Sequence, residues 1–197
     1  GYTDTEACFY LAKMYGVDIP KLREPSTSDK LASSLRILYN MATDFYKSQL
    51  HSEAGQSCLD YLKRSIQEGG RAYTDTTIST FELGYAPKGS KFLEYAQSKG
   101  YKIDLLVQSG LVRESKRNAG NYYDFFRNRL VFPIWDSMGA TIAFTARVLP
   151  TIGDTTNNNN IPKYINTPEN VVFKKRNTIY GLHIACLLYT SDAADES

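Results

Sequence analysis

DFFRNRLVFPIWDSMGATIAFTARVL, residues 124–149, is the stretch that decides the fold. Apolar side chains alternate with other residues along both of its halves, which is the period of half-buried β-strands. Between the halves, Asp136 to Gly139 has the composition of a turn, and Gly139 suits the positive φ of a bulged hairpin loop. The stretch therefore predicts an antiparallel hairpin. Its alternating apolar residues are Leu130, Phe132 and Ile134, then Ile142, Phe144 and Val148.

A three-residue loop of Ser137, Met138 and Gly139 would set the register of this hairpin and pair apolar residues with one another. In that register Arg129 faces Arg147, and like charges opposite each other cost about 0.2–1 kcal/mol. A polyanion over that face would remove the cost. The alternative is that both guanidinium groups point into solvent or pair with acids nearby. The predicted apolar pairs are Ile134 with Ile142, Phe132 with Phe144 and Leu130 with Ala146. The acids that could pair with the two arginines are Asp124 and Glu169.

The stretch IPKYINTPEN after the hairpin carries a cation next to an aromatic ring. Lys163 and Tyr164 suit contact with a phosphate and stacking on a base. Asn166 is expected to position this contact. Thr167 is of the N-cap type and Pro168 is common at a first helical position, so we expect a helix to begin here. Its free backbone N–H groups would favour an anion.

Positive charge is concentrated in the same part of the chain. From Arg113 to Arg176 there are ten Lys or Arg and five Asp or Glu, so this segment carries +5 in a chain whose net charge is +2. This asymmetry is typical of a nucleic-acid surface rather than of a uniformly basic protein. The alternative is a solvated basic face without a ligand. Tyr122 and Tyr123, beside these cations, suit either the core or a contact.

Taken in order, these motifs resemble the bacterial DNA primases of the DnaG type, in the subdomain that precedes their metal-binding TOPRIM catalytic domain. That family has Arg-x-Arg before Phe-Pro-Ile, an acidic turn with Gly, a strand closing on Gly-Gly-Arg, then Pro-Lys-Tyr-x-Asn-Ser-Pro-Glu and Leu-Tyr-Gly. The chain departs from it at Thr145-Ala146, in place of Gly-Gly, and at Thr167, in place of Ser. The matching residues are Arg127, Arg129, Phe132, Pro133, Ile134, Asp136, Gly139, Arg147, Pro162, Lys163, Tyr164, Asn166, Pro168, Glu169, Phe173, Lys174, Tyr180 and Gly181.

The resemblance implies part of an enzyme, a DNA-directed RNA polymerase (a nucleotidyltransferase) that synthesises short RNA primers on single-stranded DNA in replication. This chain would bind and guide the template strand and the RNA–DNA hybrid. A replicative helicase would be a partner through a C-terminal domain outside this chain. The alternative is a stand-alone module that binds single-stranded nucleic acid without catalysis. The expected nucleic-acid contacts are Arg127, Arg129, Arg147, Lys163 and Tyr164, with Asn166 as a positioning residue.

Nucleotidyl transfer generally needs carboxylates that hold two divalent cations. The acids of this chain are scattered, and no Gly-rich phosphate loop accompanies them. We therefore expect no catalytic residue, no metal ligand and no cofactor here; the resemblance implies magnesium or manganese, and zinc, for the full-length protein. His51 and His183 are expected to be incidental. Three cysteines far apart, Cys8, Cys58 and Cys186, fit reduced thiols without a disulfide or a zinc site.

The part of the chain before the hairpin predicts helices, so the expected class is α+β: a helical N-terminal half followed by a small antiparallel sheet with a basic face. A long helix with Ser28 as N-cap should run to Leu50 and bury one face. That face comprises Leu31, Leu35, Leu38, Met41, Phe45 and Leu50. Further elements are expected as a helix from about Glu53 carrying Leu59, Leu62 and Ile66, a short helix from Thr74, a strand and turn in Phe81–Pro87, and helices at Lys91–Ser98 and Ile103–Gln108.

Two of these segments also match the family. They are Tyr61-Leu62 and the run FELGYAP at 81–87. The arginine that follows Tyr-Leu in the family is displaced here by an insertion, so both Arg64 and Arg71 remain candidates for it.

The chain is expected to be a fragment with three parts. Residues 1–27 would be the end of an inter-module region and linker, without the ligands of the family's zinc-binding module. Residues 28–185 would be the N-terminal subdomain of the primase core. Residues 186–197, CLLYTSDAADES, resemble a translated sequencing adapter, which we exclude from the fold. Because no apolar run reaches the length of a membrane span and no signal peptide is visible, we expect a cytoplasmic protein without a membrane partner.

Overall fold

The computed structural model describes residues 10–16, 26–149 and 161–184. The chain divides into two units, Gly1–Lys30 and Leu31–Ser197, and the sheets belong to the second unit. Much of the expected linker (17–25) and the expected adapter (186–197) lie outside the described residues, so the domain boundaries stay predictions. None of the described helices is both long and apolar enough to cross a bilayer.

The long helix α2 (Thr27–Leu50) is confirmed, but it begins before the predicted cap. The hydroxyl of Ser26 accepts a hydrogen bond from the backbone N–H of Asp29 at 3.2 Å, and the Asp29 carboxylate accepts one from the N–H of Ser26 at 2.8 Å. This reciprocal pair is a capping box, so Ser26 is the N-cap in place of Ser28. The predicted buried face is confirmed for Leu35, Leu38, Phe45 and Leu50, while Leu31 and Met41 are only partly buried.

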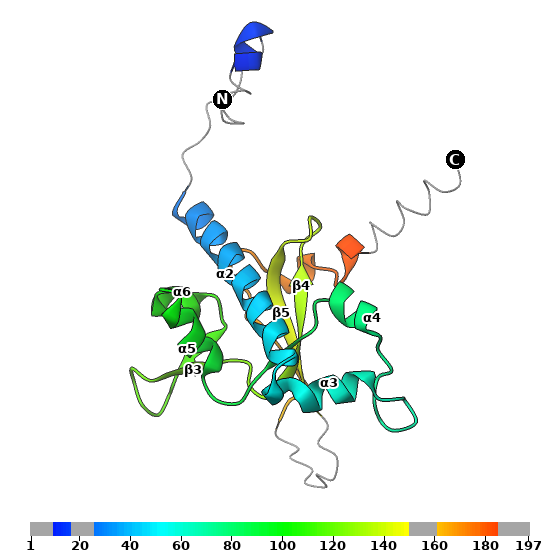
Figure 1. Cartoon of the computed structure of the whole chain (residues 1–197). Coiled ribbons are helices and arrows are strands. Elements are labelled where there is room, and N and C mark those ends of the chain that lie inside the picture. Colours follow the sequence, from blue (N-terminus) through cyan, green and yellow to red (C-terminus); the bar gives the residue numbers. More distant parts are fainter. Residues whose placement is uncertain (1–9, 17–25, 150–160, 185–197) are drawn as a thin grey trace, which may run out of the picture. The chain divides into compact units, whose positions relative to one another are not determined.

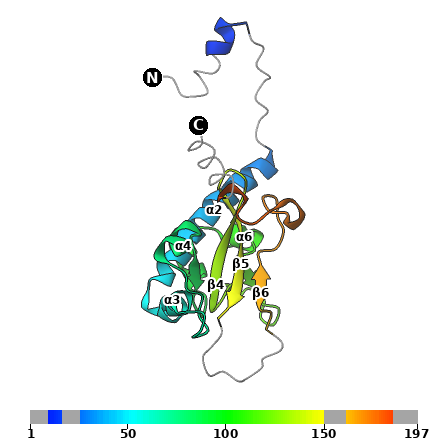
Figure 2. The ribbon, with the colours of Figure 1, turned by 90° about the vertical axis from the view of Figure 1, so that its right-hand side faces the viewer.

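Helices pack on one face of a four-stranded antiparallel sheet, and α3 and α4 pack against its β1 and β4 strands in a second core, which confirms the α+β class. Its strand order is β1-β4-β5-β6, and Figures 1 and 2 show β4 and β5 at its centre. Val131 and Phe144 pack in the core that contains α2, whereas Leu130 packs with α3 and α4 in a second core. The bounds are β1 Gly84–Ala86, β4 Arg129–Trp135, β5 Thr141–Val148, β6 Tyr164–Asn166, α3 Gln56–Lys63 and α4 Asp75–Thr80.

The hairpin forms as predicted, but most of its register is wrong by one residue. The turn is right: Gly139 has φ +82°, and the Asp136 N–H donates to the Ala140 carbonyl at 2.9 Å. Trp135 then pairs with Thr141, as a three-residue loop requires, but the register shifts between Ile134 and Trp135. The extra residue is Ile142, and such a bulge moves every later pair by one. The observed pairs are Ile134 with Ala143, Pro133 with Phe144, Phe132 with Thr145, Val131 with Ala146, Leu130 with Arg147 and Arg129 with Val148.

The shorter elements expected before the β4–β5 hairpin are confirmed with one exception. The helix expected from Glu53 is a 3-10 turn, η1, followed by α3, and the chain leaves α3 at Arg64, so Ile66 is 71% exposed rather than buried. The sequence also gave no sign of a two-stranded sheet that pairs β2 with β3. The remaining bounds are η1 Glu53–Gly55, α5 Lys91–Ser98, α6 Ile103–Gln108, β2 Val112–Glu114, β3 Tyr122–Asp124 and η2 Lys175–Asn177.

Asp124 caps α5 from outside the helix. Its carboxylate accepts hydrogen bonds from the backbone N–H groups of Phe92 at 2.8 Å and Leu93 at 2.9 Å, whereas the helix's own N-cap, Ser90, makes no side-chain cap bond. Burial raises the pKa of Asp124 to about 6, although the two N–H donors oppose this. Compared with the unfolded chain, the fold therefore makes protonation of Asp124 easier.

We expect this group to make stability fall as pH rises. An acid whose pKa is higher in the folded chain than its ordinary value contributes most below that ordinary value, and it loses this contribution through about pH 6. In urea unfolding at about pH 4 and about pH 7, the uncharged variant Asp124→Asn should show a smaller decrease than the wild type. The exposed Asp104→Asn, in the first turn of α6, is the control. Equal decreases in wild type and Asp124→Asn would contradict the assignment.

Candidate nucleic-acid interface

The structure separates the six predicted contact residues into three places. Arg147 and Tyr164 are directly opposite in the β5–β6 ladder, and Asn166 is opposite Thr145. Lys163 immediately precedes β6 and is exposed, as is Asn166. These four residues thus share one edge of the sheet, whereas Arg129 and Arg127 lie elsewhere.

Arg147 is held between two tyrosine rings at this edge. Its guanidinium carbon is 5.4 Å from the ring centroid of Tyr61 and 5.9 Å from that of Tyr164, and its Nη1 donates to the Tyr61 hydroxyl. Although Arg147 is only 8% exposed, its Nε is buried without a hydrogen-bond partner among the described residues. Burial of an unpaired donor is costly. The arrangement leaves a donor for a ligand.

The residues around Arg147 form a cavity of about 430 Å³, which we call the sheet-edge groove. Arg71 also lies over Tyr61, one of the two rings that contact Arg147: its guanidinium carbon is 5.5 Å from the centroid of the Tyr61 ring. The groove therefore combines two guanidinium groups with several aromatic rings. Its lining consists of Arg71, Tyr73, Leu130, Phe132, Thr145, Arg147, Tyr164 and Tyr180.

Arg129 does not face Arg147, so the predicted like-charge pair is wrong. Because of the bulge, Arg129 pairs with Val148, and the alternation of a strand directs adjacent residues to opposite faces. Its Nη1 donates to the carbonyl of Pro162 at 2.9 Å and lies 3.4 Å from those of Ala146 and Lys163. Burial lowers the pKa of this guanidinium below its ordinary value. In this position Arg129 fixes the backbone that leads into β6.

Arg127 lies beside the β2–β3 sheet. Its guanidinium carbon is 4.8 Å from the ring centroid of Tyr123 in β3. A direct contact of Arg127 or Arg129 with nucleic acid stays a prediction, and neither residue lines the sheet-edge groove.

The helix predicted at Thr167 and Pro168 is absent from the described residues that follow β6. Thr167 is fully buried because it continues the sheet: its hydroxyl accepts from the N–H of Phe144 at 2.9 Å, and its own N–H donates to the Phe144 carbonyl at 2.9 Å. Asn170 makes the next turn, where its side-chain oxygen accepts from the N–H of Val172 at 3.0 Å. The expected anion site at a helix start is therefore not formed.

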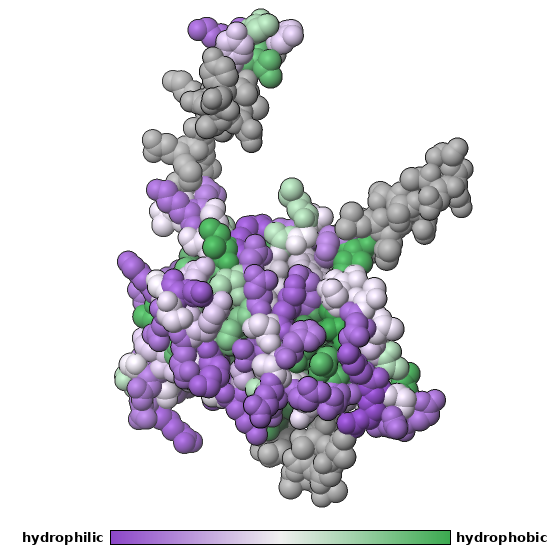
Figure 3. All heavy atoms as spheres, viewed as in Figure 1, coloured by the Kyte–Doolittle hydropathy of each residue, from purple (hydrophilic) through white to green (hydrophobic). Residues whose placement is uncertain are grey.

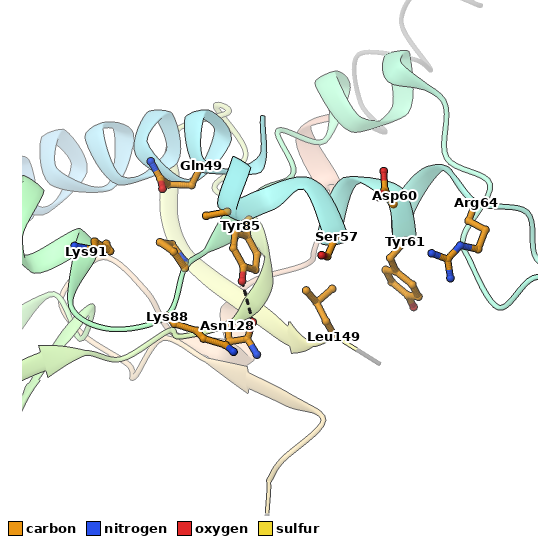
Figure 4. A pocket seen from close by; sticks show the side chains of 12 residues that line it. Gln49, Ser57, Asp60, Tyr61, Arg64, Tyr85, Lys88, Lys91, Asn128 and Leu149 are labelled. Atoms are coloured by element: carbon orange, nitrogen blue, oxygen red, sulfur yellow. Dashed lines mark hydrogen bonds between the residues drawn. The ribbon is translucent and has the colours of Figure 1, made fainter. Parts of the chain in front are cut away.

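Sequence reasoning missed three rings around Arg147: Tyr73 and Tyr180 line the groove, and Tyr61 lies against the Arg147 guanidinium group. The signal for one of them was the Tyr-Leu motif. The structure also separates the two candidates for the family's arginine, because Arg71 lines the groove while Arg64 lines a second cavity of about 720 Å³. Figure 4 shows Tyr61 and Arg64 projecting from the end of α3 toward that cavity.

The second cavity is also basic. Lys88 and Lys91 line it together with Asn128, whose side-chain oxygen accepts a hydrogen bond from the Tyr85 hydroxyl at 2.8 Å (Figure 4). Tyr61 lines this cavity and is also the ring beneath Arg147, so α3 contributes to both sites.

The described residues contain neither a metal-ligand cluster nor an activated thiol. Within residues 10–16, 26–149 and 161–184, no group of three or more His, Cys, Asp or Glu side chains could hold a metal ion. Cys58 is fully buried, and burial raises the pKa of its thiol to about 12, which makes it a poor nucleophile.

Comparison with solved structures first gives the class of the fold, the RNA polymerase domain of a DNA primase. Over 78% of this chain and 45% of the other, it superimposes on the RNA polymerase domain of Mycobacterium tuberculosis primase DnaG with a TM-score of 0.64 and 28% identity. Over 80% of this chain and 46% of the other, it superimposes on a DnaG primase catalytic domain bound to ssDNA with a TM-score of 0.65 and 30% identity.

The sequence gives the family itself. Residues 45–186 match the family described as DNA primase catalytic core, N-terminal domain, and the chain belongs to this family. It is 35% identical to a DNA primase of Rickettsia typhi over 94% of this chain and 28% of that protein, and 38% identical to one of Deinococcus radiodurans over 87% and 26%. The chain thus spans little more than a quarter of the length of these relatives.

Proposed function

We propose that this chain is the part of a DNA primase that holds the single-stranded template in the sheet-edge groove while an RNA primer is made. The observation that carries the proposal is Arg147, which lies against Tyr61 and Tyr164 and whose buried Nε has no hydrogen-bond partner among the described residues; the exposed Lys163 directly precedes Tyr164. A cation next to an accessible ring is the combination that single-stranded nucleic-acid sites use.

The chemistry of the groove suits an unpaired strand. Tyr164 is 51% exposed, so its ring can accept a base, and stacking of this kind contributes about 1–3 kcal/mol per base. Thr145, which stands in place of the first Gly of the family's Gly-Gly, also lines the groove and limits how closely a strand can approach β5. Arg71, in the lining of the groove, and the exposed Lys163, just before β6, would contact phosphates of the strand.

The comparisons support this reading at the level of the family. One similar DnaG catalytic domain is described as bound to ssDNA, and a similar Aquifex aeolicus primase as containing zinc-binding and RNA polymerase domains. In our proposal, the catalytic carboxylates, with magnesium or manganese, belong to a part of the primase outside this chain. That part would share the contact with the RNA–DNA hybrid. Zinc and a replicative helicase would also bind to parts of the primase outside this chain.

Fluorescence anisotropy with a labelled oligothymidylate at several salt concentrations tests the groove. We expect Lys163→Ala to weaken binding several-fold and to reduce the slope of log K against log salt by about 1, because one phosphate contact is lost. Tyr164→Ala should weaken binding by about 1–3 kcal/mol with little change in that slope, because it removes a stacking surface.

Lys99→Ala is the matched control, since Lys99 is an exposed lysine outside the groove whose Nζ lies 5.5 Å from the Tyr95 ring centroid. It should bind as the wild type does. The proposal fails if the wild type does not bind at low salt, or if Lys99→Ala weakens binding as much as Lys163→Ala.

A further inference from the structure

The β2–β3 sheet carries cations and rings that the groove does not use. Arg113 in β2 is directly opposite Tyr123 in β3, and its guanidinium carbon lies only 3.9 Å from the ring centroid of Phe125. Arg127 lies over Tyr123 at 4.8 Å. The strand pairing and the two ring contacts link these four side chains into one cluster, which we call the hairpin stripe: Arg113, Tyr123, Phe125 and Arg127.

The stripe is strongly positive. Arg113 and Arg127 are exposed, and the turn between the strands adds the exposed Lys116 and Arg117. None of the four forms a salt bridge within the part of the chain that the structure describes. On the face shown in Figure 3, hydrophilic residues cover the region of this hairpin.

The two acids of this hairpin are already engaged. The Glu114 carboxylate accepts a hydrogen bond from the N–H of Gly120 at 2.8 Å. Asp124 is 1% exposed and caps α5. Arg127 is close enough to Asp124 for its charge to lower the pKa of that acid, but none of these cations forms a salt bridge among the described residues, and rings lie against Arg113 and Arg127.

The rings distinguish this surface from the sheet-edge groove. Tyr123 and Phe125 are partly buried, with a guanidinium group over each, whereas Tyr164 is 51% exposed, so these two rings offer less accessible surface to a base than Tyr164 does. Sites for single strands combine cations with accessible rings. A duplex keeps its bases stacked inside and offers phosphates to cations that carry no sequence information.

We propose that the hairpin stripe, with Lys116 and Arg117, binds the sugar-phosphate backbone of a nucleic-acid duplex. The inference rests on the proposed function, because a primer paired with its template is a duplex that must lie against the protein that copies the strand. The guanidinium groups donate through their outer edges, while the rings beneath them limit their motion. Duplex DNA and an RNA–DNA hybrid share this phosphate chemistry.

The test uses the whole chain and fluorescence anisotropy with three probes: a blunt DNA duplex, an RNA–DNA hybrid and an oligothymidylate. We expect Arg113→Gln/Arg117→Gln to weaken duplex binding about tenfold and to reduce the salt slope by about 2, because about 0.9 is lost for each phosphate contact. Its affinity for oligothymidylate should stay within about twofold of wild type. Comparison of the two duplex probes shows which one the stripe prefers.

Two further variants and one control show whether a loss of binding comes from unfolding. Lys116→Glu/Arg117→Glu changes only the exposed turn and should weaken duplex binding at least as much. Arg113→Lys/Arg117→Lys keeps the charges and should retain most of it. Lys99→Gln, which removes a cation over a ring outside the stripe, should bind the duplex as wild type does.

The outcomes separate this inference from the groove. Loss of duplex binding in the stripe variants, with oligothymidylate binding intact, supports it. The inference is overturned, and the groove left in place, if the wild type binds oligothymidylate but no duplex. It is also overturned if the stripe variants bind the duplex as well as the wild type does. A wild type that binds only the duplex, through the stripe, supports it while the proposed function fails.

Discussion

Replacement of Phe144 by alanine is expected to lower the free energy of unfolding by about 3–5 kcal/mol, the usual cost of removing a large buried aromatic side chain. Phe144 has no exposed surface, and three rings surround it. The centroid distances are 5.9 Å to Tyr39, 5.5 Å to Tyr46 and 6.4 Å to Phe126. Because these neighbours belong to α2 and to the segment before β4, they could not close the cavity without moving the helix off the sheet.

Urea unfolding followed by circular dichroism measures this loss. Phe132→Ala is the matched control, because Phe132 is in the paired strand but on the other face, where it is partly buried and lines the sheet-edge groove. We expect it to lose less than half as much. Equal losses would mean that the core between α2 and the sheet does not dominate the stability.

The sequence could predict those elements that depend on local signals. The bounds of α5 and α6 were predicted without error, and the short helix expected from Thr74 begins there, with the Thr74 hydroxyl accepting from the N–H of Thr77 at 3.1 Å. In each case the apolar period and the flanking polar residue lie within a few positions of one another. The turn at Asp136–Gly139 was predictable for the same reason.

The bulge at Ile142 was not predictable, although it decides the site. Thr141, Ile142 and Ala143 are all buried, so alternation is lost at the start of β5, and small residues further along fit either face. One extra residue was enough to send Arg129 and Arg147 to opposite faces. The pattern of apolar residues sets the register only where one face alone is buried.

The wall of the groove and the hairpin stripe were beyond sequence reasoning for another reason. Tyr73 and Tyr180 line the groove and Tyr61 lies against Arg147 only through the tertiary fold, and no local period links the three residues. The strands β2 and β3 have three residues each, too few for an alternating pattern to stand out. The charge excess between residues 113 and 176 was predictable, but its division between two surfaces was not.

Two buried arginines with different partners give the second prediction. Arg147→Met should weaken binding of an oligothymidylate about tenfold or more, because the groove loses a charge-assisted donor between two rings. The thioether chain keeps apolar contact with Tyr61, so the loss in stability should be small. Arg147→Lys keeps the charge but not the planar group that lies between the rings, and we expect intermediate binding.

Arg129→Met is the matched comparison, since Arg129 is equally buried in the neighbouring strand but bonds only backbone carbonyls. It should lose about 1–3 kcal/mol of stability, because the carbonyls that lead into β6 lose their donor. Under conditions where both variants are folded, its affinity for oligothymidylate should fall less than that of Arg147→Met. Anisotropy and urea unfolding measured on the same samples give both quantities. If Arg129→Met weakened binding more than Arg147→Met, the strand would lie on the other face of the sheet, and the groove would lose its role.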